Sequence, residues 1–177
     1  MKRLLILFFA ALLWAPVSMA QITEDISDVT GEYRISSDSM NDLWIDSYAG
    51  DYGAYIARYV SNPVTGSDQW MLILYGFTDE ETTLSTSNDV TVEINGSTLR
   101  PLEVNTRTRA LDDNEIMEVK ETHFSQSVFQ RIANADEVRI TVGNESFQLP
   151  ERPDMQLVAQ TALLEDNGEH TASSEDQ

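Results

Sequence analysis

The stretch that decides the fold reads YGAYIARYVSNPVTGSDQWMLILYGF and spans residues 52–77. Its first part alternates as a strand does, with Tyr55, Ala57 and Tyr59 on one face and Ala54, Ile56, Arg58 and Val60 on the other. Its last part, Gln69–Phe77, is almost entirely apolar, as expected for a central strand that is covered on both faces. Asn62, Pro63 and Gly66 between them favour a turn. We therefore predict a long β-hairpin at the centre of an antiparallel sheet.

Shorter runs with the same alternation lie on both sides of this hairpin. They cover Glu32–Ser36, Leu43–Tyr48, Val90–Ile94, Leu99–Val104, Glu115–Glu121, Val138–Val142 and Ser146–Leu149. Asn95-Gly96 predicts a tight turn, and Pro101 places the return strand at an edge. Residues 21–29 fit either a helical turn or an ordered leader.

The apolar spacing becomes helical near the C-terminus. A helix is predicted after Ser125, which is a good N-cap, and another after Asp154. The sequence therefore predicts a mainly β or α+β fold, with an antiparallel sheet or sandwich of about eight strands and two short C-terminal helices.

Three segments differ in composition. Residues 1–20 join Lys2 and Arg3 to an apolar run and a small-residue cleavage site, which is typical of a signal peptide. Residues 21–164 form a single β-rich domain. Residues 165–177 carry five acids and no lysine or arginine, and we predict a disordered acidic tail. No apolar run beyond residue 20 is long enough to span a membrane, so we expect no transmembrane segment after cleavage.

Charge is the most unusual property of the whole chain. It has 11 basic and 30 acidic residues and a net charge of −19. Loss of Lys2 and Arg3 leaves nine basic residues, a net charge of −21 and Lys120 as the sole lysine. Dispersed acids with little lysine indicate halophilic adaptation, and a binding surface for cations or a basic partner is the alternative. The same charge argues against nucleic-acid binding.

The sequence offers few candidates for catalysis or cofactor binding. There is no cysteine, no phosphate-binding loop and no serine nucleophile elbow, and His123 and His170 are the only histidines. No cofactor is expected, although calcium is possible because carboxylates cluster in loops. Asp112 and Asp113 are the leading calcium candidates. A carboxylate-based hydrolase, with or without calcium, stays open as one alternative.

Aromatic residues before and within the hairpin are the candidate partner-binding residues. Trp44, Tyr55 and Tyr59 would form such a surface if they were exposed on the sheet, and cross-strand core packing is the favoured interpretation.

Taken together, these features predict an exported bacterial envelope protein, periplasmic or secreted, since the chain joins a signal peptide to an absence of cysteine. We expect a non-enzymatic binding or structural accessory domain whose partner is an envelope protein or a glycan. An inhibitor or chaperone that docks a basic partner is the second alternative.

Overall fold

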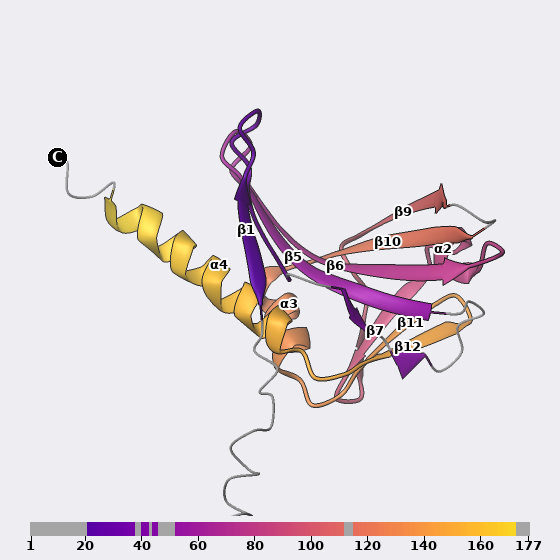
Figure 1. Cartoon of the computed structure of the whole chain (residues 1–177). Coiled ribbons are helices and arrows are strands. Elements are labelled where there is room, and N and C mark those ends of the chain that lie inside the picture. The colour runs from indigo at the N-terminus through magenta and orange to yellow at the C-terminus, as the bar shows by residue number, and fades with distance from the viewer. Residues whose placement is uncertain (1–20, 38–39, 43, 46–51, 112–114, 173–177) are drawn as a thin grey trace, which may run out of the picture.

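The computed structural model describes residues 21–37, 40–42, 44–45, 52–111 and 115–172. These residues form two antiparallel sheets and three helices (Figure 1). The large sheet has the strand order β1-β2-β5-β6-β10-β9, with the two-residue β3 also paired to β5. The small sheet has the order β4-β12-β11-β7-β8. This architecture confirms the predicted α+β, sandwich-like class.

The bounds of the elements follow the chain. The strands of the large sheet are β1 (Ile22–Ile26), β2 (Tyr33–Ser37), β3 (Asn41–Asp42), β5 (Tyr52–Asn62), β6 (Ser67–Thr78), β9 (Glu103–Ala110) and β10 (Ile116–Phe124). Those of the small sheet are β4 (Trp44–Ile45), β7 (Val90–Ile94), β8 (Ser97–Leu99), β11 (Val138–Val142) and β12 (Glu145–Leu149). The helices are α2 (Thr83–Thr86), α3 (Gln126–Asn134) and α4 (Pro153–Ala172).

The predicted central hairpin is confirmed. β5 and β6 pair along their whole lengths, from Tyr52 opposite Phe77 to Asn62 opposite Ser67. Both helices predicted near the C-terminus are also present, and the side chain of Ser125 caps α3 by accepting a hydrogen bond from the Val128 N–H. α4 continues to Ala172, beyond the position at which the sequence predicts the acidic tail to begin.

The prediction for Leu99–Val104 is wrong in one respect, because this segment contributes to two strands in different sheets. The turn at Asn95-Gly96, where both residues have positive φ, returns the chain through β8, which ends at Leu99. Pro101 cannot donate to a strand ladder, and the chain leaves the small sheet there. It then enters β9 at the edge of the large sheet. The undecided segment near the N-terminus is strand β1, which pairs with β2.

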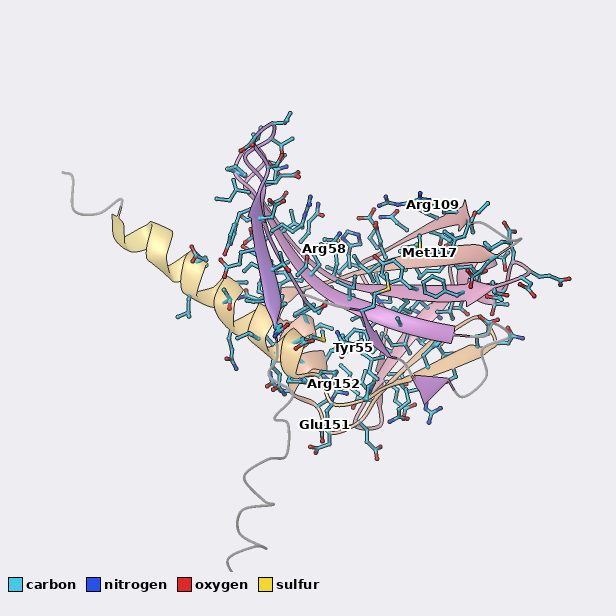
Figure 2. The ribbon with its side chains drawn as sticks, viewed as in Figure 1. Tyr55, Arg58, Arg109, Met117, Glu151 and Arg152 are labelled. Atoms are coloured by element: carbon cyan, nitrogen blue, oxygen red, sulfur yellow. The ribbon has the colours of Figure 1, made fainter. Side chains whose placement is uncertain are left out.

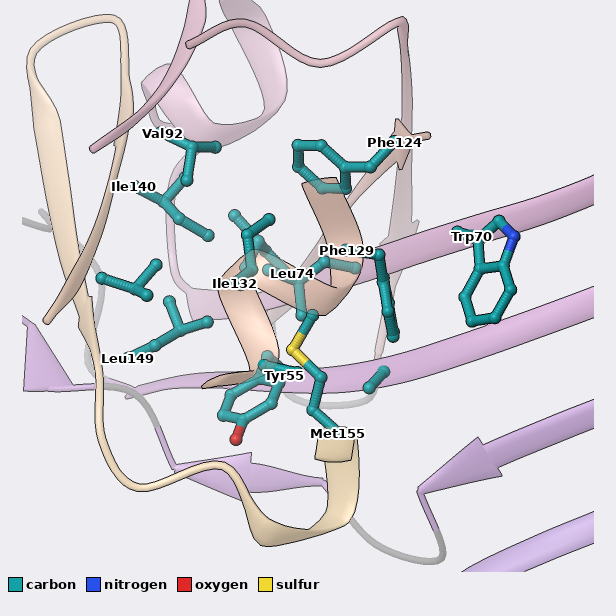
Figure 3. Close-up of a cluster of buried hydrophobic side chains, with 14 of the residues drawn as sticks. Tyr55, Trp70, Leu74, Val92, Phe124, Phe129, Ile132, Ile140, Leu149 and Met155 are labelled. Atoms are coloured by element: carbon teal, nitrogen blue, oxygen red, sulfur yellow. The ribbon is translucent and has the colours of Figure 1, made fainter. Parts of the chain in front are cut away.

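The core lies on the inner face of the large sheet. The small sheet covers one end of this face and helices α3 and α4 cover the other (Figure 1). Figure 3 shows side chains from both sheets and both helices meeting there, among them Leu74, Ile140, Phe129 and Met155. The Trp70 ring lies 4.6 Å from that of Tyr59 and 5.3 Å from that of Phe129, so an aromatic cluster joins the hairpin to α3.

Candidate binding face

Among the candidate residues from the sequence, the structure describes the side chains of Tyr55 and Tyr59. Tyr55 is fully buried and Tyr59 is 3% exposed, so both rings belong to the core and offer no surface to a partner. Trp44 lies in β4, paired with Gln148 of β12, and its side chain lies outside the described part of the structure. Asp112 and Asp113 also lie outside the described residues.

The inner face of β10 carries a polar cluster that sequence analysis missed. Glu118, Lys120 and Thr122 alternate along the strand and are all fully buried. Glu118 accepts hydrogen bonds of 2.6 Å from the Thr82 N–H, the Thr82 hydroxyl and the Ser85 hydroxyl. Buried charges are tolerated only when they are compensated in this way. The period of the segment EIMEVKE predicts a strand but gives no sign that its charged side is the buried one.

Glu145 of β12 completes this cluster. Its Oε2 accepts a hydrogen bond from the Leu84 N–H at 2.9 Å and lies 3.2 Å from the Thr82 hydroxyl oxygen. Two carboxylates from different sheets therefore bind the first N–H groups of α2, which a helix leaves without internal partners. Because these oxygens are occupied by donors of the protein and the side chains are buried, the pair is suited to holding α2 in place.

Lys120 is fixed in the same region. Its Nζ donates to the Ser87 carbonyl at 2.6 Å and to the Thr106 hydroxyl at 2.5 Å. Burial lowers the pKa of Lys120, and the nearby charge of Glu118 partly offsets this effect. The lysine thus joins the loop after α2 to strand β9.

A second buried polar group closes the opposite end of the core. Arg152, just before α4, donates to the carbonyls of Ile132, Ala135, Leu149 and Pro150. It thereby satisfies carbonyl groups at the end of α3, where the helix leaves them free, and connects them to β12. Burial lowers the pKa of this guanidinium.

The buried hydroxyl of Tyr55 makes no hydrogen bond in the described structure, and burial raises its pKa to about 12.

The outer face of the large sheet has a different character. Within the described residues no helix or second sheet packs on it (Figure 1). Side chains that pair across the strands place Ile56, Ile73 and Tyr75 at its centre, with Met71, Val60 and Val119 beside them. This apolar cluster is separate from the main core. Four of the arginines, Arg34, Arg58, Arg107 and Arg109, lie on the same face, together with the acids Asp25, Glu103 and Glu121.

The arginines of this face differ in their partners. Arg107 forms an ion pair of 2.5 Å with Glu121, and Arg34 lies 3.9 Å from Asp25. Among the described residues no carboxylate lies within 4.0 Å of Arg58 or Arg109. The Nε of Arg58 donates to Ser36 at 3.0 Å. Its pKa is lowered by burial first and by the charges of Arg34 and Arg107, while Tyr75 and Glu121 act in the opposite direction. In Figure 2, Arg58, Arg109 and Met117 lie on one side of the large sheet, and Tyr55 and Arg152 lie on the other.

An acidic cavity of about 430 Å³ lies between the N-terminal strands, the central hairpin and α4. Its lining includes Glu24, Asp68 and Glu165 together with Tyr33 and Tyr59. The Tyr33 hydroxyl donates to Glu24 at 2.6 Å, and burial together with this carboxylate raises the pKa of Tyr33. The lining suits cationic rather than anionic groups.

No group of three or more histidine, aspartate or glutamate side chains is arranged to hold a metal ion in the described part of the chain. In the same residues no helix has both the length and the apolar character that crossing a membrane requires.

Comparison with protein-family models, with curated proteins and with solved structures gives no match.

Proposed function

We propose that this chain is an exported binding domain of a bacterial envelope, periplasmic or secreted, without catalytic activity of its own. In this proposal the outer face of the large sheet is the binding surface, and the partner is an acidic protein with some apolar side chains. The signal-peptide pattern of residues 1–20 and the lack of cysteine support export.

The proposal is carried by the position of two arginines that have no carboxylate within 4.0 Å among the described residues. Arg58 and Arg109 stand on an uncovered sheet face, Arg58 opposite Met71 and Arg109 opposite Met117, in a chain whose net charge is −19. Arginine and aromatic side chains are the residue types most enriched in protein interfaces. A guanidinium without a carboxylate partner can bind an incoming carboxylate through two parallel hydrogen bonds.

The charge of the rest of the molecule gives this surface a distinctive response to salt. At low ionic strength the many distant acids repel an acidic partner, because screening extends over roughly 30 Å at 0.01 M salt. Near 0.15 M salt the screening length falls to about 8 Å, so the distant repulsion weakens while contacts to Arg58 and Arg109 persist. Affinity should therefore rise from low to moderate salt and fall only at higher salt.

The test uses a random copolymer of glutamate and tyrosine as the probe, with a lysine–tyrosine copolymer for comparison. We expect the acidic copolymer to bind and Arg109→Glu to weaken binding roughly tenfold, since the variant turns an attraction into a repulsion. Arg131→Glu makes the same change of charge on the exposed side of α3 and should leave binding within about twofold. Equal losses in the two variants, or no binding of the acidic copolymer, would overturn the proposal.

The acidic cavity favours the second candidate, which is docking of a basic partner as an inhibitor or chaperone would dock it. Glu24, Asp68 and Glu165 would then receive lysine or arginine side chains, and Tyr33 would contribute an aromatic surface. Binding of the lysine–tyrosine copolymer that weakens steadily with every increase in salt would favour this candidate. Asp68→Asn would weaken it, whereas Arg109→Glu would not.

A further inference from the structure

No described strand pairs with the outer edge of β9, and the hydrogen-bond register shows which of its backbone groups face outward. β9 is the last strand of the large sheet on one side (Figure 1). Leu111 N donates to the Glu115 carbonyl, and the same register places Arg109 opposite Met117 and Arg107 opposite Val119. Because hydrogen-bonded and non-bonded pairs alternate in an antiparallel ladder, Arg107 and Arg109 direct their backbone groups to β10. Those of Thr108 and Ala110 point away from the sheet.

The outer half of this edge is open. Residues 107–110 are all exposed, and no hydrogen bond of their outward N–H groups occurs in the described structure. The first half of β9 is more enclosed, because the Thr106 hydroxyl accepts a hydrogen bond from Lys120 Nζ and donates one to Asn88 Oδ1 at 3.3 Å. An incoming chain would therefore pair along residues 107–110.

The side chains of β9 select the kind of strand that can pair there. Arg107 and Arg109 project onto the outer face on either side of Thr108. Opposite charges on neighbouring strands stabilise a sheet, and like charges destabilise it. A second copy of β9 would bring arginine next to arginine, whereas a strand with alternating acidic residues would bring carboxylates next to them.

We propose that β9 binds an extended acidic segment of a partner protein as an additional strand of the large sheet. This inference rests on the proposed function, because it specifies how the acidic partner reaches the outer face. The main chain of the segment pairs with Thr108 and Ala110, and its carboxylates lie beside Arg109 and Arg107. This mode of recognition takes affinity from backbone hydrogen bonds and selectivity from alternate side chains.

The experiment compares Thr108→Pro with Thr108→Ala. Proline removes the outward N–H of residue 108 and leaves the bonds between β9 and β10, as proline on an edge strand does. Alanine removes the same side chain and keeps the N–H. The probe is a labelled seven-residue peptide in which glutamate alternates with valine and threonine. We expect Thr108→Pro to weaken binding of this peptide at least about tenfold and Thr108→Ala to change it less than about threefold.

A second arm keeps the protein unchanged and alters the peptide, so the test survives if Thr108→Pro does not fold. Methylation of alternate backbone nitrogens should abolish binding when it removes the N–H groups that face β9, and should have little effect on the other set. Equal binding of both methylated peptides, or of Thr108→Pro and Thr108→Ala, would overturn strand addition.

The same experiment separates this inference from the proposed function. If Arg109→Glu weakens peptide binding and Thr108→Pro does not, the outer face binds acidic partners without adding a strand. If none of the acidic peptides binds to the wild-type chain, the proposed function fails as well. If Thr108→Pro instead converts a dimer of the chain into a monomer, measured by sedimentation, the edge is occupied by a second copy and the proposal is wrong.

Discussion

The two faces of the large sheet are built from the same strands, yet their charged side chains differ in burial and in their partners. On the inner face of β10 the charged groups of Glu118 and Lys120 are buried, and each is bound by several neutral donors or acceptors. On the outer face Glu121 has one ion pair, and Arg109 has no carboxylate within 4.0 Å among the described residues. Charges on the first face hold the fold together, and we propose that those on the second bind a partner.

Glu118→Ala and Glu121→Ala change the same residue type on opposite faces of one strand. We expect Glu118→Ala to lower the free energy of unfolding by about 3–5 kcal/mol, because it leaves buried donors of Thr82 and Ser85 unpaired. Glu121→Ala should cost less than about 1 kcal/mol, as is usual for an exposed ion pair. Urea denaturation measures both, and similar losses would remove the distinction between the faces.

Arg152→Lys tests the other buried polar group of the inner side. Lysine carries its donors on one nitrogen and cannot reach the four carbonyls that the planar guanidinium binds, so we expect a loss of about 2–4 kcal/mol. Arg131→Lys, on the exposed side of α3, is the matched control and should change stability by less than about 0.5 kcal/mol. If Arg152→Lys left the stability unchanged, the end of α3 would be held by packing alone.

Tyr55→Phe should stabilise the chain at neutral pH by about 1 kcal/mol, because it removes a buried hydroxyl that has no partner. The folded state raises the pKa of Tyr55 from 10.0 to about 12, so the unfolded chain releases this proton first. Folded wild-type protein therefore loses stability as the pH rises from 10 toward 12, by up to about 1.4 kcal/mol per pH unit. The Tyr55→Phe variant should lose less stability between pH 10 and pH 12. Parallel pH dependences of unfolding for the two proteins would contradict this.

Added NaCl should raise the melting temperature, since screening reduces the mutual repulsion of the excess acids. We expect a rise of roughly 5 °C between low salt and about 2 M NaCl in thermal unfolding followed by circular dichroism. The same series near pH 3, where most carboxylates are neutral, is the control and should show a smaller rise. A flat response at neutral pH would argue against halophilic adaptation.

The sequence was a good guide wherever a single local pattern decided the structure. The hairpin of β5 and β6 was visible in its alternation and turn residues, and α3 was visible in its N-cap and apolar spacing. The sequence was a poor guide where alternation allowed either side of a strand to be the buried one. The pattern of Glu115–Glu121 places Glu118 and Lys120 on one side of a strand, but charge suggests that this side faces water.

The candidate binding face shows the same limit. Arg58 could be assigned to one side of β5 together with Ile56 and Val60, and the structure bears this out. The position of Arg107 on the same face could not be foreseen, because only the strand order places β5 and β9 in one sheet, with β6 and β10 between them. Tyr55 and Tyr59 illustrate the converse, since the same alternation left open whether their side of the strand was the core.

By itself, then, the sequence determined the class of the fold, its central hairpin and its unusual charge, because these depend on local periodicity and composition. Which face of each strand is buried follows from packing, since it depends on which sheet and helices cover that face. The sequence predicted an edge strand near Pro101, and the strand order shows that two strands take this place, β8 in the small sheet and β9 in the large one. The pairing of β9 with β10 places Arg107 and Arg109 on the same face as Arg34 and Arg58.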